Sequence, residues 1–317
     1  MLSALRTLKL ASITMLLLTL VTSCDKLKYF YPHGSSDKTI AEIVSANENY
    51  KFLKLALIRA GLVDAVSKPG TLTVFAPDNA AFAAAGFPNA DAINNADPEV
   101  LKSILLYHVV GTKITSGQIP TADNTPVATL AGKDIFVTKK SDKISVNGVP
   151  VVAADIKASN GVIHAISKVL VPPTGNIVEV AQGNSNFTFL VSAVLRASQG
   201  STNVAAALSG AGPLTVFAPT NQAFINAGFP SIESINAADP ATLTTILTYH
   251  VLAARVFSSN LVNNAEVATF NGGTVKIKLN GGAKVKGKSN PSASNIVLAD
   301  LVATNGVVHV IDQVLLP

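Results

Sequence analysis

The sequence predicts an α+β fold that occurs twice in tandem, and three observations support this. The string TLTVFAP at 71–77 returns as LTVFAP at 214–219, and the residues around it repeat at the same spacing. The period of about 140 residues fits one independent hydrophobic core and is far too long for a solenoid unit. Within each copy, apolar residues have helical spacing first and alternating spacing later. We therefore expect two domains, at 37–172 and 173–317.

The repeat covers nearly the whole of each copy. The motif Ile-x-Glu at Ile40 returns at Ile177, and NGVIHAISKVLVP at 160–172 returns as NGVVHVIDQVLLP at 305–317. The second copy carries extra residues near 198–213 and between 257 and 305, where surface loops tolerate insertions. The Pro-Pro-Thr-Gly segment at 172–175 is the expected linker between the two copies.

The first half of each copy reads as helices interrupted by one strand. Apolar residues at helical spacing predict two helices over 40–60, and Gly61 is a typical helix stop. The alternating residues 71–77 predict a strand that Pro77 ends. Asp78 or Asn79 can then cap the next helix, and Thr220 and Asn221 hold these places in the second copy.

The next helix begins with a strong start signal and leads into the strands. Asp97 is the expected N-cap, Pro98 occupies the first helical position, and His108 closes the apolar stripe. Asp239, Pro240 and His250 repeat this pattern. Alternating runs at 135–138, 144–146 and 162–166 then predict strands. The expected domain packs helices on an antiparallel sheet.

The N-terminus reads as an export signal. Arg6 and Lys9 precede an apolar stretch at 10–20, which is too short for a membrane span, and a small-residue site follows. Cys24 lies where the bacterial lipobox places its modified cysteine. This resemblance implies a signal peptide over 1–23, lipid attachment at Cys24 and a tether over 24–36. Alternatives are an ordinary signal peptide cut at Ser23 or an unprocessed apolar start.

Composition indicates aliphatic cores and no special chemistry. Hydrophobic residues make up 48%, charged residues 14%, and tryptophan is absent. The net charge of +5 includes Arg6 and Lys9, so charge alone does not indicate nucleic-acid binding. The chain contains no Gly-x-Ser-x-Gly, Gly-rich phosphate loop or His-Glu-x-x-His motif, and its five histidines are scattered. Cys24, its single cysteine, excludes disulfides within the chain. No catalytic residue, metal site or cofactor is therefore predicted.

Three repeated segments resemble the fasciclin domain. They are a TVFAP strand followed by Asn-x-Ala-Phe, a Tyr-His at the end of the next helix, and a final Asn-Gly-Val-x-His segment. The resemblance implies a β-wedge covered by helices, and an extracellular role in adhesion between cells or to a matrix. Many bacterial members are secreted or surface lipoproteins. The family carries no catalytic residue across.

The resemblance also names candidate interaction residues. In animal relatives the Tyr-His region has been linked to receptor binding, which carries over to Tyr107, His108, Tyr249 and His250. The structural alternative is that each histidine is buried and hydrogen-bonded to a backbone carbonyl, and His164 and His309 receive the same interpretation. Asn79 and Asn221 look functional because they repeat, although helix capping explains them equally well.

A lysine-rich hairpin distinguishes the second copy. The run 274–288 predicts two strands around Asn-Gly-Gly with lysine at every second position, so five lysines would line one face. One interpretation is an edge hairpin whose lysines prevent sheet-to-sheet aggregation. The other is a docking stripe for an acidic polymer such as anionic polysaccharide or extracellular DNA. The candidate residues are Lys276, Lys278, Lys284, Lys286 and Lys288.

The expected function is that of a non-enzymatic, membrane-anchored adhesion or interaction protein in the cell envelope. Expected partners are a cell-surface or matrix protein or an anionic polysaccharide, with self-association as a further option and no sequence-specific nucleic acid. The anchor would be the lipid, at the outer membrane and cell surface or facing the periplasm. The alternative is a carrier of an apolar ligand, a carotenoid or a lipid, because some members of the family bind carotenoids.

Overall fold

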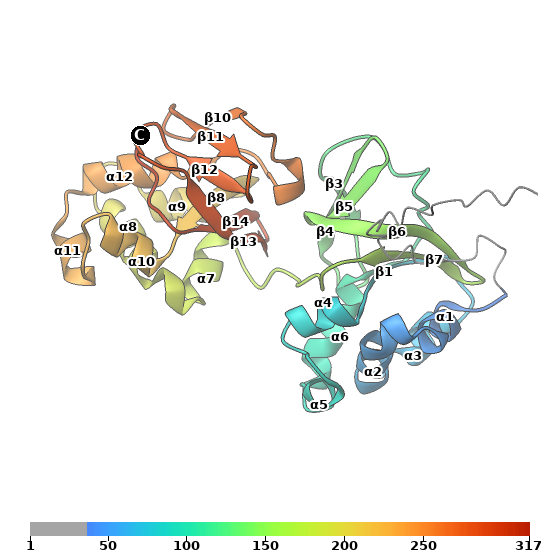
Figure 1. The fold of residues 1–317 in the computed structure, drawn as a ribbon. Helices are drawn as coiled ribbons and strands as arrows, with labels where there is room; N and C mark the ends of the chain where they lie inside the picture. Colours follow the sequence, from blue (N-terminus) through green and yellow to red (C-terminus); the bar gives the residue numbers. More distant parts are fainter. Residues whose placement is uncertain (1–36) are drawn as a thin grey trace, which may run out of the picture. The chain divides into compact units, whose positions relative to one another are not determined.

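The computed structural model describes residues 37–317 (Figure 1). The predicted signal peptide, Cys24 and the tether lie outside the described residues. The two halves have the same α-helices and strands in the same order, and we call them the first domain (α1 to β7) and the second domain (α7 to β14). The domain limits of 37–172 and 173–317 remain predictions. No helix within 37–317 is long and apolar enough to cross a bilayer.

Six helices belong to each domain, among the residues described. In the first domain they are α1 (Ile40–Ala46), α2 (Lys51–Arg59), α3 (Val63–Ser67), α4 (Asn79–Ala84), α5 (Ala90–Asn94) and α6 (Pro98–Tyr107). In the second they are α7 (Ile177–Gln182), α8 (Thr188–Ala197), α9 (Val204–Ser209), α10 (Asn221–Asn226), α11 (Ile232–Ala237) and α12 (Pro240–Tyr249). Short 3-10 turns are η1 (Glu48–Tyr50), η2 (Ser185–Phe187) and η3 (Ser258–Asn260).

Each domain contains seven strands. The first has β1 (Leu72–Pro77), β2 (Val109–Val110), β3 (Thr125–Ala128), β4 (Asp134–Lys140), β5 (Lys143–Val146), β6 (Val149–Ala158) and β7 (Gly161–Ile166). The second has β8 (Leu214–Pro219), β9 (Val251–Leu252), β10 (Glu266–Ala268), β11 (Thr274–Lys278), β12 (Lys284–Lys286), β13 (Ser294–Ala303) and β14 (Gly306–Ile311). The strand orders are β2-β1-β7-β6-β5-β4-β3 and, equivalently, β9-β8-β14-β13-β12-β11-β10.

The α+β class and the wedge are confirmed, but each sheet is mixed rather than purely antiparallel. β1 pairs in parallel with β7, and β8 pairs in parallel with β14, while the other pairs are antiparallel. The parallel pair joins the two signature strands of a domain. Because these strands lie far apart in the chain, a long connection of helices and further strands can return the second strand in the same direction.

A bulged strand bends each sheet into the wedge. The pairing of β6 with β7 shifts register twice, and the pairing of β13 with β14 does the same. Within these irregularities Asp155 (φ 60°) and Asp300 (φ 67°) adopt left-handed backbone conformations. Bulges turn a strand sharply. The start of β6 also pairs with β5, which continues the sheet into β4 and β3.

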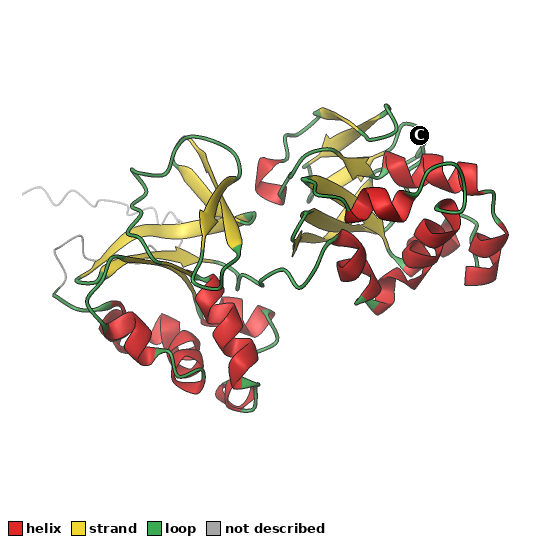
Figure 2. Cartoon of the chain, turned by 180° about the vertical axis from the view of Figure 1, so that it is seen from behind, coloured by secondary structure: helices red, strands yellow, loops and turns green. Residues whose placement is uncertain are grey.

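The central strands separate two apolar layers. In β8 the alternating residues Leu214, Val216 and Ala218 pack with the helices, whereas Phe217 packs with the strands of the wedge. Figure 2 shows the helices of each domain gathered on one side of its sheet. Successive side chains of a strand point to opposite faces. A strand buried on both faces is therefore apolar almost throughout, which explains why TVFAP lacks a polar side.

Candidate functional sites

The predicted helix start and the Tyr-His pair lie at opposite ends of α6. Asp97 caps α6 by accepting from the Glu99 N–H at 2.9 Å, and Asp239 caps α12 by accepting from Thr242, with proline at the first helical position in both. These predicted caps are confirmed. Each helix ends in the Tyr-His pair at the border between the helices and the wedge.

Tyr107 ties α6 to a hairpin of the wedge. Its side chain is fully buried, and its hydroxyl donates to the Asp134 carbonyl at 2.9 Å and accepts from Asn147 Nδ2 at 3.0 Å. Burial raises the pKa of Tyr107 to about 12, so the hydroxyl stays protonated. Because Asp134 opens β4 and Asn147 follows β5, Tyr107 binds both ends of the β4–β5 hairpin.

His108 ties the same helix to the end of the domain. Nδ1 donates to the Ile104 carbonyl at 2.8 Å, and Nε2 accepts from the Leu170 N–H at 2.9 Å. Burial lowers the pKa of His108 to about 4, so the ring is neutral at pH 7. The neutral ring has one donor and one acceptor nitrogen, and both are in use.

The second domain repeats this arrangement. The Tyr249 hydroxyl donates to the Thr274 carbonyl and accepts from the Lys288 N–H at 2.9 Å. His250 donates to Ile246 and accepts from Leu315, and burial lowers its pKa to about 4. All four residues of the Tyr-His pairs are thus buried and build the domains. Binding of a partner by these side chains remains a prediction.

Asn79 and Asn221 have a role other than the capping we expected. Asp78 and Thr220 cap the helices that follow, while Asn79 Oδ1 accepts from the Phe52 N–H at 2.9 Å and Nδ2 donates to the Glu48 carbonyl at 2.7 Å. Asn221 makes the same bonds to Phe189 and Ser185. Each amide therefore fixes the start of α2 or α8 against the strand that carries TVFAP.

Asn160 and Asn305 are structural residues whose individual roles the sequence did not reveal. Asn160 Oδ1 accepts from the Ile40 N–H at 2.9 Å, and Nδ2 donates to the carbonyls of Val66 and Lys68 at 2.9 and 3.0 Å. Asn305 repeats this with Ile177, Leu208 and Gly210. Their recurrence at the start of each Asn-Gly-Val segment was the available signal. They join the first helix, the third helix and the last strand of each domain.

A second polar group surrounds the bulges, and the sequence indicated only its two histidines, which are buried and hydrogen-bonded to backbone carbonyls as the structural interpretation expected. Asp155 accepts from the N–H of Ser116 at 2.8 Å and from its hydroxyl, and its own N–H donates to His164 Nδ1 at 3.3 Å. Ser258, Asp300 and His309 repeat the cluster. Burial lowers the pKa of both histidines, so neither carries charge at pH 7. The aspartates hold the loop before β3 or β10 onto the bulge.

The polar side chains of these clusters are engaged in hydrogen bonds within the protein. No buried side-chain nitrogen or oxygen within residues 37–317 lacks a hydrogen-bond partner. In the same part of the chain, no three His, Cys, Asp or Glu side chains lie close enough to hold a metal ion. The repeated polar residues thus have bonds inside their own domains, and binding chemistry must be sought on surfaces and in cavities.

Four of the five candidate lysines share one face of the second domain's wedge. In the β11–β12 pair, Lys276 lies opposite Lys286 and Lys278 lies opposite Lys284, while Ile277 and Val285 between them are buried. Lys288 lies in the turn after β12 and not on this face. The prediction that five lysines line one face is therefore wrong for Lys288. Like charges directly opposite one another destabilise a sheet by up to about 1 kcal/mol per pair. We call the other four residues the lysine face.

The hairpin does not lie at a sheet edge, which corrects one of the two interpretations. β11 pairs with β10 on one side, and β12 pairs with β13 on the other. Lysines that prevent edge-to-edge pairing belong on the outermost strand, because only that strand has unpaired backbone groups. In this part of the described chain the outermost strand is β10, which contains no lysine. Protection of an edge therefore does not explain the lysine face.

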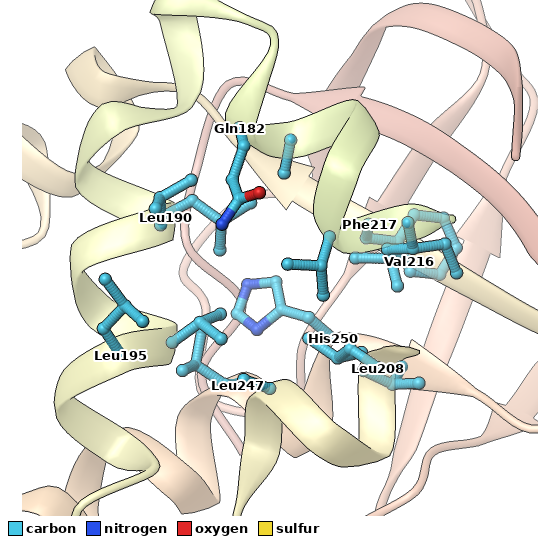
Figure 3. Close-up of a pocket in the computed structure, with 15 residues that line it drawn as sticks. Gln182, Leu190, Leu195, Leu208, Val216, Phe217, Leu247 and His250 are labelled. Carbon is cyan, nitrogen blue, oxygen red and sulfur yellow. The ribbon is translucent and has the colours of Figure 1, made fainter. Parts of the chain in front are cut away.

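An apolar cavity of about 90 Å³ lies among the helices of the second domain (Figure 3). Leu190, Leu208, Val216 and Leu247 line it, and Figure 3 shows the Gln182 amide and the His250 ring on its wall. The equivalent space in the first domain holds only about 20 Å³. Two lining positions change in the direction of this difference: Val44 and Leu57 of the first domain correspond to the smaller Ala181 and Val194.

A second hollow lies inside the wedge of the first domain. It encloses about 270 Å³ between Phe75, Ile119, Val127 and Val137, and it opens beside the exposed Lys113. Both nitrogens of the lining His164 are hydrogen-bonded to backbone groups. In the first domain this hollow is larger than the space among the helices.

Comparison with known proteins identifies the repeated domain. The model of the fasciclin domain matches residues 48–172 and again residues 185–317. The chain belongs to the fasciclin family. Both fasciclin domains are thus shown, as the sequence resemblance predicted. Membership of this family supports an interaction role without catalysis.

Relatives of this fasciclin protein occur in bacteria and animals. Protein sll1483 of Synechocystis sp. is 43% identical over 141 residues, covering 44% of this chain and 76% of the relative. Transforming growth factor-beta-induced protein ig-h3 of Sus scrofa is 30% identical over 252 residues, covering 78% of this chain but only 35% of the relative. The fasciclin domain pair of the insect cell adhesion molecule fasciclin I has a TM-score of 0.40 at 18% identity, over 86% of this chain and 98% of that one.

Proposed function

We propose that this fasciclin protein is a membrane-anchored interaction protein of the cell envelope that binds cell-surface or matrix components without catalysis. Its partners would be a surface or matrix protein or an anionic polysaccharide. The observation that carries the proposal is that the repeated polar residues are hydrogen-bonded inside their own domains. The buried Tyr-His pairs would then support binding by fixing the hairpins whose outer faces meet a partner.

The lipid anchor rests on the sequence around Cys24. In a bacterium that processes lipoproteins, the full-length C24S variant is expected to incorporate no labelled fatty acid, because the acyl chains are attached at this cysteine. Its membrane fractionation is not a test, because the apolar stretch at 10–20 stays on a chain that is not cut before residue 24. Palmitate labelling with immunoprecipitation measures the effect, and Ser35→Ala, in the predicted tether, is the matched control that should be labelled like the wild type. Label on C24S, or none on the wild type, would contradict lipidation at Cys24.

Exposure on intact cells tests the adhesion role itself. An external protease should remove both fasciclin domains from intact cells while leaving a periplasmic marker undamaged, because an adhesion protein must reach its partners outside the cell. Full protection would instead favour a function that faces the periplasm. The digestion, together with an assay of cell aggregation, distinguishes a protein exposed outside the cell from one that faces the periplasm.

A second function, transport or storage of an apolar ligand, is favoured by the cavity among the helices of the second domain. Its lining is apolar, and both nitrogens of His250 are already hydrogen-bonded, so it suits a molecule without strong polar groups. Engineered cavities of comparable character remain dry and accept small apolar molecules. A carotenoid or lipid would use this space only in part, with the remainder lying across the open side.

Filling the cavity gives a testable result. The double variant A181V/V194L installs the side chains of the first domain and adds about three buried carbon atoms, so it should stabilise the second domain by about 1–2 kcal/mol. If the cavity holds a ligand in cells, the apolar molecule extracted from purified wild-type protein should be missing from this variant. Mass spectrometry of the extract and thermal unfolding measure both effects.

The reverse variant in the first domain is the control. V44A/L57V should open equivalent space and destabilise that domain by about 2 kcal/mol or more, without changing any ligand held by the second. An extract free of apolar molecules from the wild-type protein would contradict the carrier function. It would leave the expected gain in stability of A181V/V194L unaffected.

A further inference from the structure

We propose that the lysine face of the second domain binds a linear anionic polysaccharide. The inference rests on the interaction role proposed above and names one ligand class for it. Lys276, Lys278, Lys284 and Lys286 stand as two directly opposed pairs on neighbouring strands. Opposed residues lie about 5 Å apart and next-but-one residues of a strand about 7 Å apart, so the four form a compact array of positive charge.

The array is poorly neutralised by the protein itself. Lys276 Nζ lies 3.7 Å from Glu266 Oε1, and Lys278 Nζ donates to the neutral amide of Asn264 at 2.8 Å. Within residues 37–317, Lys284 and Lys286 have no acidic side chain within ion-pairing distance. Of the acidic side chains within 37–317, only Glu266 lies within 4 Å of a lysine of this face, while Asp312 is bonded to Asn295 beside Lys284. An external polyanion would supply the missing negative charge and offset the repulsion between the pairs.

The fold does not require these lysines. At the positions of Lys276 and Lys278 the first domain has Phe136 and Thr138, and Thr138 lies opposite the neutral Ser145. The two strands, their register and their buried residues are otherwise kept. Two copies of one module thus differ in charge at the same place, as expected when one copy has acquired a binding surface.

The neighbouring side chains favour a polysaccharide over other polyanions. The neighbours of the array along these strands are small or polar: Glu266 pairs with Lys276, Asn295 pairs with Lys284, and the next-but-one pair along β10 and β11 is Ala268 with Thr274. Single-stranded nucleic acid is held by stacking of bases on aromatic side chains, and none of the paired residues named here is aromatic. Protein interfaces depend on buried aromatic or arginine anchors, and these paired residues include neither. A chain of carboxylated or sulfated sugars needs only spaced positive charges on an open surface.

The structure also explains how the array is kept in register. The Tyr249 hydroxyl binds the carbonyl of Thr274 at the start of β11 and the N–H of Lys288 just after β12. On the other side of the pair, Val285 pairs with Ser294 and Lys284 with Asn295 of β13. The backbone beneath the lysines is therefore fixed by bonds to its neighbours. Binding of a ligand would then cost conformational entropy only in the lysine side chains.

The test uses the full-length protein in neutral detergent with immobilised heparin and alginate as probes. The wild type should be retained by at least one of them at low salt and released by salt, since such binding is strongly screened. In the variant K276Q/K278Q/K284Q/K286Q, affinity should fall about tenfold or more. The control K51Q/K54Q/K68Q/K157Q removes four exposed lysines of the first domain, with the same change in net charge, and should bind like the wild type.

Each outcome decides the matter. Thermal unfolding must show that the lysine-face variant is at least as stable as the wild type, because its like-charge pairs are gone. Equal retention of both quadruple variants, or no retention of the wild type, would overturn the inference. Tighter binding to duplex DNA through the same lysines would overturn the ligand class. Protection from protease on intact cells would contradict the surface role without touching these results on purified protein.

Discussion

Acidification from pH 7 to pH 4 is expected to lower the free energy of unfolding of each domain by about 3 kcal/mol. The reason is that the folded domains bury the rings of His108 and His250 in the neutral form. Burial depresses the pKa of both histidines from 6.5 to about 4. Between these values the unfolded chain binds a proton that the folded domain does not. Stability from this source is fully present above pH 6.5 and is lost as the pH falls towards 4.

The two histidines beside the bulges act in the same direction. Burial also lowers the pKa of His164 and His309, so their contribution is likewise lost on acidification. The pKa values of exposed carboxylates such as Glu42 and Asp239 are lowered by hydrogen bonds. These groups therefore become protonated, and lose those bonds, only at a pH below the range in which the histidines titrate. The interval from pH 6.5 to about pH 5 therefore reports mainly on the histidines.

Urea unfolding followed by circular dichroism at pH 7, 6 and 5 measures the effect. Replacing His108 with glutamine should weaken the first domain at pH 7 and flatten its dependence on pH, because the amide does not titrate. Replacing His33, which precedes both domains, should leave the pH dependence unchanged. Equal stability of the wild type at pH 7 and pH 5 would show that the buried rings accept protons without penalty, contrary to their geometry.

Replacing Asn160 or Asn305 with alanine should lower the free energy of unfolding of its domain by about 4 kcal/mol. Each amide serves one backbone N–H and two backbone carbonyls, and those of Asn160 belong to Ile40, Val66 and Lys68. A buried polar group left without a partner costs about 1–3 kcal/mol, and the three groups lose their partner together. Alanine cannot reach any of them.

Urea unfolding at pH 7 gives the free energy change for N160A and N305A. The matched control is Asn186→Ala, at an exposed position whose side chain makes no hydrogen bond within residues 37–317. This variant should change the free energy of unfolding by less than about 0.5 kcal/mol. Proteolysis should first cut α1 in N160A and α7 in N305A. A loss below about 1 kcal/mol would mean that water replaces the amide and that the helix is held by packing alone.

The sequence predicted the parts of the fold that depend on local signals. Asp97 and Pro98 predicted the start of α6 because a capping side chain and a fixed φ act within one turn. The alternation of 274–278 predicted that Lys276 and Lys278 share a face, since this follows from strand geometry alone. The position of that hairpin inside the sheet was not predictable, because β13 joins it from a segment further along the chain.

Roles that depend on partners far along the chain could not be predicted from the sequence for the same reason. Asn79 lies where a cap is favourable, yet its amide reaches Phe52 across 27 residues of chain. The direction of β7 beside β1 has no local signal, since both strands are apolar on both faces. Asp155 gave no indication of its left-handed backbone, because that conformation is imposed by the bulge and by the bonds to Ser116.

The bonds of Asn160 and His108 also bear on which piece of this chain can fold as a copy. Asn160, directly before the last strand, binds the first residue of α1, and His108, in the middle of the module, binds Leu170 after the last strand, so both ends of the module are held by buried groups. A copy lacking either end would carry unpaired polar groups in its interior. We therefore expect that a duplication had to transmit the stretch from Ile40 to Leu170 as one inheritable block.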